Sequence, residues 1–430
     1  MLLRLDEEKV FKDPVHRSIY VQDAVIWRLI NTPEFQRLRR IRQLGTSYLT
    51  FHGAEHSRFS HSLGVYEIAR KIISQFERNG YGDWPREERL LGLCAALLHD
   101  VGHGPFSHSI ERVFRTDHER WTCDIILGDT EIHRVLAEVS PDFPGQVASV
   151  IRKESAHPIV VNLVSSQLDA DRMDYLLRDA YFTGVHYGTF DLDRILRVLR
   201  PHKGRIVVKE SGMHAVEDYL MSRYQMYWQV YFHPVTRSSE LLLYQIFRRA
   251  RQLYEDGYRF AFMLPPLRRL LEGTMDVADY LMLDEAVMQA TFGQWTLERD
   301  RLLADLCDRF LHRRLYKYST LEEKDETWVE ELRREWSRIG LDPDYHLAMD
   351  EPADSPYDVY RPDDGREGGG KPPILILDDR ERLTEISAKS DIIRSIAGIQ
   401  RGKFYLYYPA ELVRPHAARL SPDVRERLGL

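Results

Sequence analysis

The chain has 430 residues, of which 43% are hydrophobic, and a formal net charge of −7. This composition supplies a real core and excludes global disorder, and the negative charge argues against a general nucleic-acid coat protein, although local basic patches remain open. The three cysteines are far apart, the charged N-terminus lacks the pattern of a signal peptide, and no apolar run approaches the roughly 20 residues of a membrane helix, so we expect a cytoplasmic protein without membrane contact, disulfide framework or zinc–thiolate site.

The first strong helix signal covers residues 34–44, preceded by the start signal Thr-Pro-Glu at 32–34. Four arginines surround its apolar stripe, namely Arg37, Arg39, Arg40 and Arg42. Such a cluster is usually a solvated face of a helix. Because the guanidinium fork binds phosphate in a bidentate manner, phosphate binding is the alternative.

The next predicted helix begins near His61 and carries an apolar stripe of helical period from Val65 to Phe76. His61 lies four residues before Val65 and therefore on the same inward stripe. A single inward histidine is more often a satisfied core residue than a metal ligand. His52 and His56, in the loop before the helix, are weaker candidates.

The densest group of metal-competent side chains follows a short apolar helix predicted at residues 90–98. This run delivers His99 and Asp100 side by side, and a Gly-rich turn then adds His103 and His108. A polar pair at the end of a buried helix needs a partner, because buried charge without compensation is costly. A divalent metal is one such partner; a hydrogen bond between the two side chains is the alternative.

Two later stretches add acids and a further histidine. Glu111 and His118 lie in the next predicted helical stretch. A helix predicted over 160–180 places Asp171 on the buried face, whereas Asp169 is rotated well away from it. An acid on an apolar stripe is rarer, and more informative, than an acid that faces water.

The second half of the chain is predicted to be mostly helical. We expect helices at 191–199, 214–233 and throughout 238–340, and a short strand at 205–209. Residues 350–373 are acidic and rich in proline and glycine, which is typical of a linker or mobile loop. Beyond them, the strand-like segments ILILDD and KFYLYYP flank a helix at 387–399, which indicates a small α/β piece.

His61, the pair His99–Asp100 and Asp171 each lie on or beside an inward face, on three separate predicted helices. Two imidazoles and two carboxylates make a mixed nitrogen and oxygen site, which suits Mn, Fe, Mg, Ni or Zn rather than a structural zinc cage. Open coordination positions for water and a phosphate oxygen would make such a site hydrolytic.

Five segments resemble the SAM-and-HD-domain deoxynucleotide triphosphohydrolases and their bacterial relatives, within the HD-domain phosphohydrolases. They occur in the same order and with matching gaps over roughly residues 10–235: KVFKDPVH, TPEFQRLRRIRQLG, HSRFSHSLGV, LLHDVGHGPFSH and DADRMDYLLRD. With the C-terminal pattern, this resemblance predicts a mainly α chain. A helical HD domain would cover 1–320, with its metal-binding core at about 50–182, and 321–430 would hold the linker and the small α/β appendage.

The resemblance implies site residues in three groups. The implied metal ligands are His61, His99, Asp100 and Asp171. The implied active-site residues around the scissile phosphate are His103, His108, Glu111 and His118, with His108 as proton donor to the leaving 5′ oxygen. The implied substrate-binding residues are Gln43, Leu44, Arg58, Arg172, Tyr175, Asp179, Arg223 and Tyr231.

The activity implied by the resemblance is metal-dependent hydrolysis of deoxynucleoside triphosphates to a deoxynucleoside and triphosphate, by a homo-oligomer that we expect to be a tetramer. A nucleotide activator is a further partner to test, although Asn31 stands where guanine-activated relatives carry an acid. Tyr227 replaces a histidine near the substrate, which is expected to alter the preferred base.

Two alternatives stay open. One is an HD phosphohydrolase acting on nucleoside monophosphates or other phosphoesters. The other is a nucleotide- or nucleic-acid-binding regulator with a silent site, which the basic stretches at 34–44 and 238–252 keep under consideration.

Overall fold

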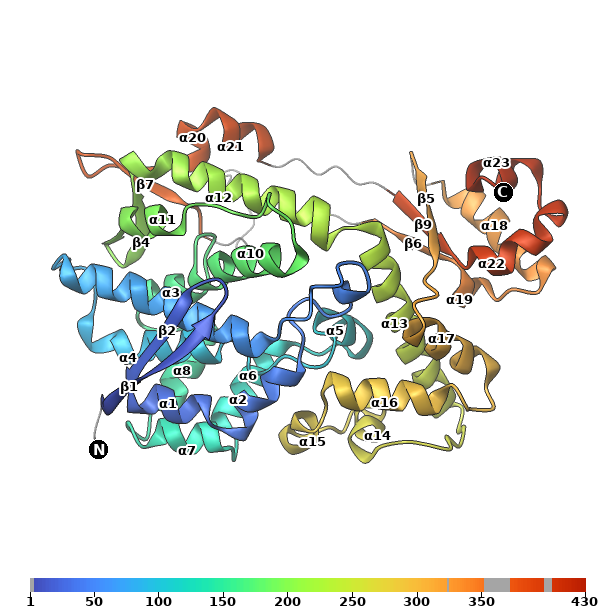
Figure 1. Ribbon diagram of the computed structural model, residues 1–430, viewed down its shortest axis with the longest axis horizontal. Helices are drawn as coiled ribbons and strands as arrows, with labels where there is room; N and C mark the ends of the chain where they lie inside the picture. Colours follow the sequence, from blue (N-terminus) through green and yellow to red (C-terminus); the bar gives the residue numbers. More distant parts are fainter. Residues whose placement is uncertain (1–3, 323–324, 352–371, 398–403) are drawn as a thin grey trace.

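The computed structural model describes residues 4–322, 325–351, 372–397 and 404–430. Helices dominate, and three small sheets lie among them (Figure 1). Most of the predicted linker at 350–373, and the side chains of His108, Ser109 and Arg112, lie outside the described residues. Within the described ranges, no helix combines the length and the apolar character needed to cross a membrane.

The N-terminal half packs around one large hydrophobic cluster. Helix α3 (Arg58–Arg78) packs against both α4 (Arg89–Leu98) and α10 (Ala170–Thr183). The Leu/Ala-rich α4 is buried from Leu91 to Leu98, as its sequence predicts. The other helices around this cluster are α1 (Ala24–Ile30), α2 (Pro33–Arg37), α6 (His118–Leu127), α7 (Glu131–Ala137), α8 (Phe143–Ile151), α9 (Pro158–Val164), α11 (Leu192–Val198) and α12 (Met213–Met226).

Two further clusters hold the second half together. The second cluster includes Phe106, Ile110 and Val113, so that α5 (His108–Phe114) joins the two halves of the chain. Its main helices are α13 (Pro234–Glu255), α14 (Pro265–Glu272), α16 (Glu285–Trp295) and α17 (Arg301–Leu311). Helix α15 (Val277–Leu281) contacts α14 and α6, and its Val277 and Leu281 pack against the first cluster. The third cluster contains residues of α18 (Glu326–Ile339), α22 (Ala410–Val413) and α23 (Pro422–Leu428). Helix α19 (Pro343–His346) contributes Tyr345 to the second cluster.

The three sheets are small and mostly antiparallel. The first is a hairpin of β1 (Arg4–Asp13) and β2 (Arg17–Asp23). The second has the order β3 (Leu199–His202), β4 (Arg205–Lys209), β7 (Leu375–Leu377), β8 (Leu383–Glu385), in which β4 and β7 run parallel and pair Val208 with Ile376. In the third, β9 (Phe404–Tyr408) lies between β5 (Lys317–Leu321) and β6 (Ala348–Asp350).

The two C-terminal strands predicted from the sequence therefore lie in different sheets, at opposite ends of the molecule (Figure 1). Strand β7 sits beside β4 on the N-terminal half, where the short helices α20 (Ile386–Lys389) and α21 (Asp391–Ile396) also join the first cluster. Strand β9 pairs with β5 and β6 instead. The division of the chain at 320/321 stays a prediction.

Three predicted helices differ from the structure. The helix predicted at 34–44 ends at Arg37, a 3-10 turn follows, and Ile41 is extended because the next residue, Arg42, forms a bridge with Ser57. The helix predicted over 160–180 is two helices, since Asp169 accepts a hydrogen bond from the Arg172 backbone N–H at 2.7 Å and caps α10. The prediction of helix throughout 238–340 is wrong at β5.

Candidate active site

Three of the four expected metal ligands converge where α3 and α10 begin and α4 ends. His61, His99 and Asp171 each bring one potential ligand atom within 4.8 Å of the others. His61 Nε2 lies 3.1 Å from Asp171 Oδ1, and His99 Nε2 lies 3.6 Å from the same oxygen. His99 Nδ1 is 2.8 Å from the Ala96 carbonyl, and its buried Nε2 has no hydrogen-bond partner among the described residues. This donor set fits a divalent cation.

Asp100 lies beside this group and is shared with Arg58. One carboxylate oxygen, Oδ1, is 3.3 Å from His99 Nε2, and the other, Oδ2, is 3.7 Å from His61 Nε2. Oδ2 also accepts a hydrogen bond from Arg58 Nη1. Burial alone would raise the pKa of Asp100, but the neighbouring Arg58 and His99 hold that pKa well below its usual range. Asp100 is therefore ionised and oriented toward both histidines.

A buried carboxylate behind His61, Asp174, has no role in the expectations drawn from the sequence. His61 Nδ1 lies 2.8 Å from Asp174 Oδ2, while His16 Nε2 lies 2.6 Å from Oδ1. Arg178 donates to both oxygens, and it also bonds Asp13 at 2.8 Å. Asp174 and Arg178 are fully buried. We call these four residues (Asp13, His16, Asp174, Arg178) the Asp174 network.

The Asp174 network fixes the orientation of the His61 ring. Because Nδ1 donates to Asp174, Nε2 is the nitrogen presented to Asp171. Gly64 leaves room for this contact, since a Cβ there would lie 1.9 Å from Asp174 Oδ1. Burial would raise the pKa of Asp174, but Arg178 and its hydrogen bonds lower it well below its usual value. The one available sequence signal was the Asp171–Asp174 spacing of one helical turn.

A second group joins His103, Glu111 and His118, again within 4.8 Å of one another. His118 Nδ1 lies 2.9 Å from Glu111 Oε1, and the rings of His103 and His118 stack at 3.9 Å. Burial and the nearby Arg58 lower the pKa of His103 well below its usual value. Burial would lower the pKa of His118 too, but Glu111 outweighs it and raises that pKa. The stacked pair is thus set up to hold one neutral and one protonated ring.

The turn between His103 and α5 has a strained backbone. Phe106 and Ser107 have φ of 58° and 50°, a region that costs of the order of 1–3 kcal/mol for such residues. Phe106 is buried in the second cluster, and Ser107 Oγ accepts two hydrogen bonds from Arg58, at 2.8 and 3.1 Å. These contacts hold the turn that places His108 at the first position of α5.

The residues expected at the sugar meet between α10 and a π-helical turn at Tyr227–Tyr231. The Tyr231 hydroxyl donates to Asp179 Oδ2 at 2.8 Å, and the rings of Tyr231 and Tyr175 lie 6.2 Å apart. His56, a weaker candidate by sequence, lies with Nε2 2.7 Å from Asp179 Oδ1 and is only 5% exposed. Single π-helical turns are frequent at functional sites.

Two buried arginines face this region with unused donors. Arg223 is 4% exposed, and its Nε and Nη1 have no hydrogen-bond partner among the described residues. Arg172 donates from Nη1 to Asp169 Oδ2 at 2.6 Å, while its Nε is also unpartnered there. The expectation that Asp169 points away from the buried face is wrong, because Asp169 is fully buried and holds Arg172. Unpaired buried donors of this kind favour an anionic ligand.

Gln43 contacts Arg58 through its backbone carbonyl, and Leu44 follows it in the chain. The Gln43 carbonyl is 3.4 Å from Arg58 Nη2, and its side-chain Oε1 is buried without a hydrogen-bond partner in the described structure. Leu44 is half-buried against the first hydrophobic cluster. Gln43 therefore lies beside Arg58, while the substrate-binding roles of Gln43 and Leu44 stay predictions.

The arginines at 37–42 cross-link the fold. Fully buried Arg37 donates to the backbone carbonyls of Leu283 and His103, at 2.7 and 2.8 Å, and Arg42 pairs with Glu285 at 2.6 Å. The interpretation of this cluster as a solvated or phosphate-binding face is wrong for Arg37. Its guanidinium instead links Leu283, just before α16, to His103 in the turn that follows α4.

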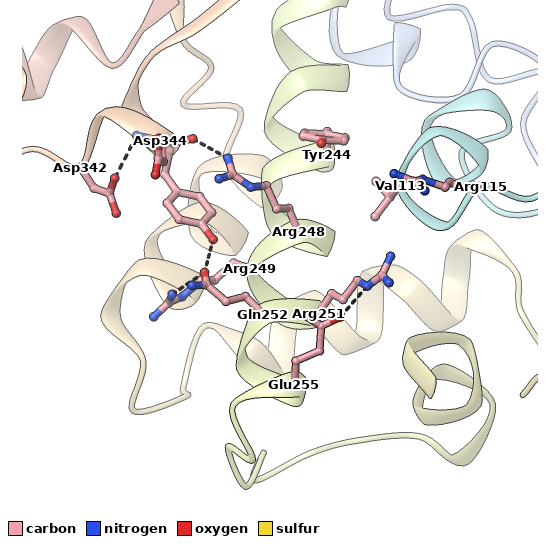
Figure 2. Close-up of a pocket in the computed structure, with 11 residues that line it drawn as sticks. Val113, Arg115, Tyr244, Arg248, Arg249, Arg251, Gln252, Glu255, Asp342 and Asp344 are labelled. Carbon is pink, nitrogen blue, oxygen red and sulfur yellow. Dashed lines mark hydrogen bonds and ion pairs between the residues drawn. The ribbon is translucent and has the colours of Figure 1, made fainter. Parts of the chain in front are cut away.

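A separate cleft of about 450 Å³ lies between α5, α13 and residues 342–345 (Figure 2). Arginines and acids line it together: Arg251 donates to Glu255 at 2.9 Å, and Arg248 donates to the Asp344 carbonyl at 2.7 Å. None of the residues of the two histidine groups lines this cleft. Its charges are largely balanced, and it is distinct from the candidate site.

Known proteins resemble the chain over both the site and the whole length. Residues 58–179 match the HD domain model, and residues 190–258 match the HD associated region. The uncharacterized protein YwfO of Bacillus subtilis is 54% identical over 99% of this chain and 98% of its own length. The crystal structure of a phosphohydrolase from Bacteroides thetaiotaomicron has a TM-score of 0.81 at 27% identity, covering 94% of this chain and all of that one.

A more distant relative is the deoxynucleoside triphosphate triphosphohydrolase SAMHD1 of Danio rerio. It is 30% identical over 56% of this chain. The matched region spans 45% of SAMHD1's own length, so the likeness concerns less than half of that protein.

Proposed function

Because the chain belongs to the HD-domain phosphohydrolases, we propose that it hydrolyses deoxynucleoside triphosphates to a deoxynucleoside and triphosphate. The observation that carries this proposal is the combination of a metal-competent group with an unpaired buried cation. His61, His99 and Asp171 form the group, and Arg223 supplies two unused donors near α10. A phosphate chain satisfies both features at once.

In this proposal His61, His99, Asp100 and Asp171 hold one divalent metal, with Mn, Mg and Fe the first to test and Ni and Zn the remaining choices. When bound, the metal supplies Lewis-acid polarisation of the α-phosphoryl group and lowers the pKa of water. Asp100 gives the site its fourth donor while staying paired with Arg58. That pairing couples the metal group to the phosphate-binding arginines.

The substrate is held by cations at one end and by aromatic rings at the other. Arg58, Arg172 and Arg223 bind the triphosphate, each through a charge-assisted contact worth roughly 1.5–3 kcal/mol, or about ten- to a hundredfold in rate. The rings of Tyr175 and Tyr231 contact the deoxyribose. The sugar pocket is completed by Gln43, Leu44 and Asp179. A tight apolar wall discriminates against a ribose 2′-hydroxyl by exclusion and needs no donor.

We assign proton transfer to His108, supported by the neighbouring group of His103, Glu111 and His118. His108 at the start of α5 protonates the leaving 5′ oxygen in this scheme. Glu111 raises the pKa of His118 and favours its protonated form, whereas burial and Arg58 lower the pKa of His103 and favour its neutral form. The group therefore places a cationic and a neutral imidazole next to the phosphate-binding arginines, which suits general acid–base chemistry near neutral pH.

We further propose a cytoplasmic homo-oligomer, a tetramer by family resemblance, whose activity is to be tested with and without nucleotide activators. Three free, buried cysteines suit a reducing compartment. Light scattering over a range of concentrations tests the assembly. A fully active monomer at every concentration would contradict it.

One assay tests the reaction itself. Each dNTP and NTP is incubated with the protein and Mn, Mg or Fe, and the products are separated by ion exchange. Deoxynucleoside plus intact triphosphate is the expected pair. Initial release of dNMP plus pyrophosphate, or dNDP plus phosphate, contradicts attack at the α-phosphorus with the 5′ oxygen as the leaving group. Turnover of monophosphates alone, or nucleotide binding without turnover, supports one of the alternative functions instead.

A further inference from the structure

A second basic pocket lies at the end of α3 opposite to His61. It has a volume of about 420 Å³ and is formed by the end of α3 and the loop after it, by α11 and by β3. Its lining residues are Gln75, Arg78, Asn79, Tyr81, Arg197 and Arg200. We call it the α3–α11 pocket. His61 and Arg78 are 17 positions apart on one helix, or about 25 Å. The pocket is therefore separate from the candidate active site.

The lining of the α3–α11 pocket is strongly cationic. Three of its six lining residues are arginines, and none of the six carries a carboxylate. The contacts described for Arg78 and Arg200 go to backbone carbonyls, at 3.3 Å for Ser74 and 2.7 Å for Leu199. In the cleft of Figure 2, by contrast, acids lie among the arginines, and Arg251 pairs with Glu255.

Part of the lining is already held in place. The Arg197 carbonyl accepts hydrogen bonds from Arg200 Nη1 at 2.7 Å and from Gln75 Nε2 at 3.5 Å. The Arg200 guanidinium also lies 5.2 Å from the centre of the Tyr81 ring. Gln75 is 9% exposed, and its Oε1 is buried without a hydrogen-bond partner among the described residues. A ligand that donates a hydrogen bond to this oxygen removes the cost of leaving it buried and unpaired.

We propose that the α3–α11 pocket binds a small phosphate-bearing anion, either free diphosphate or triphosphate or the phosphate chain of a nucleotide. Guanidinium groups match phosphate oxygens in a bidentate geometry, and Gln75 Oε1 accepts from a protonated phosphate oxygen or an amino group. A nucleic-acid backbone needs a basic stripe along the surface, whereas this is a hollow on a chain of net charge −7. This site is independent of the chemistry proposed for the metal centre.

Calorimetric titration of the full-length protein with pyrophosphate, at constant ionic strength, tests the proposal. Gln75→Glu keeps the side-chain shape and adds a negative charge, so we expect it to weaken one binding event at least tenfold. Arg78→Ala and Arg197→Ala are expected to weaken the same event. Arg223→Ala changes the proposed catalytic site, and we expect this variant to leave the same binding event unchanged. Parallel titrations with triphosphate and dATP distinguish inorganic from nucleotide ligands.

The control is Arg259→Ala, an exposed arginine outside the pocket, which should bind as the unaltered protein does. Basal turnover of dNTPs is expected to stay unchanged in Arg197→Ala, because that side chain is far from His61. Should Gln75→Glu fail to fold, the exposed Arg197→Ala decides the matter. Equal weakening in Arg259→Ala, unchanged binding in all pocket variants, or binding of oligonucleotides without pyrophosphate would overturn the proposal.

Discussion

His61 is held from both sides of its ring. Asp174 contacts Nδ1 at 2.8 Å, and Asp171 lies 3.1 Å from Nε2. The carboxylate on the Nδ1 side also accepts from Arg178 and contacts His16, so its position does not depend on His61 alone. A metal ligand with such a fixed partner keeps one tautomer and one orientation.

Asp174→Asn is expected to weaken metal binding about 10- to 100-fold, because a neutral amide replaces the charged acceptor of His61 Nδ1. Stability should fall by about 3–5 kcal/mol, since Arg178 is left buried with less compensation. Urea denaturation and metal content of the purified protein measure the two effects. Asp171→Asn is the matched variant, which should lose metal with a smaller loss of stability. Full metal content in Asp174→Asn would refute the positioning role.

Metal affinity should rise with pH. Burial would lower the pKa of His61, but the hydrogen bonds that its ring donates to Asp171 and Asp174 outweigh burial and raise that pKa to about 10 in the metal-free protein. The ring is therefore protonated at neutral pH, and a metal must displace that proton. The apparent affinity for Mg or Mn should increase up to about tenfold per pH unit between pH 6.5 and 9. Metal titrations at several pH values measure this affinity, and an affinity that does not change with pH would disprove the prediction.

Asp169→Ala is expected to leave the metal content intact and to act on the substrate side. The variant removes the cap of α10, worth about 0.5–2 kcal/mol, and leaves Arg172 without its carboxylate. We expect a higher KM for dNTPs with an unchanged metal-to-protein ratio. Arg172→Ala should show the same KM effect with less loss of stability. Loss of metal in Asp169→Ala would place this acid in the metal site instead.

At the scale of elements, helices with long apolar patterns were predictable from the sequence, whereas the points at which helices are interrupted were not. Helices α3 and α4 follow from continuous periodic or fully apolar runs, and both carry a predicted ligand at or beside an end. The start of α10 was missed because Asp169 serves as a cap, a role that depends on local backbone geometry. The Asp174 network was not predictable, since its ion pairs join Asp13 to a helix 165 positions away.

Gly64→Ala tests the close approach of α3 and α10. A glycine-to-alanine change inside a helix normally stabilises by about 1 kcal/mol. Here the new methyl group would lie 1.9 Å from Asp174 Oδ1, so we expect a net loss of about 2 kcal/mol or more and weaker metal binding. Gly293→Ala in α16 is the control, because nothing lies within 4 Å of its Cβ position. Equal unfolding midpoints for both variants would argue against this contact.

At the scale of the whole molecule, the sequence predicted a helical N-terminal region and a small C-terminal α/β piece but not where the last strands attach. Strand β7 completes the sheet of β3 and β4, while β9 lies between β5 and β6. Pairing between strands this far apart leaves no local signal. The mainly helical class was predictable because helical periodicity is local.

A chain ending at residue 320 tests how far the C-terminal region supports the rest. It lacks β7 and the buried Ile374, Ile376 and Ile393, each worth about 1.5–3 kcal/mol of burial. We expect a thermal midpoint at least about 5 °C lower and a greater tendency to aggregate through the exposed edge of β4. Thermal denaturation with light scattering measures both. An unchanged midpoint would show that residues 1–320 are a self-sufficient domain.

The parallel pairing of Val208 with Ile376 also has a consequence for biosynthesis. The two partners are 168 positions apart, and a ribosome adding 5–20 residues per second needs about 8–34 s to make the intervening chain. During that interval the edge of β4 that receives β7 has no partner within the nascent polypeptide. The helices around His61 can assemble early, whereas this sheet closes only after almost the whole message has been translated. A chaperone that shields strand edges would therefore act on the nascent chain between the synthesis of β4 and that of β7.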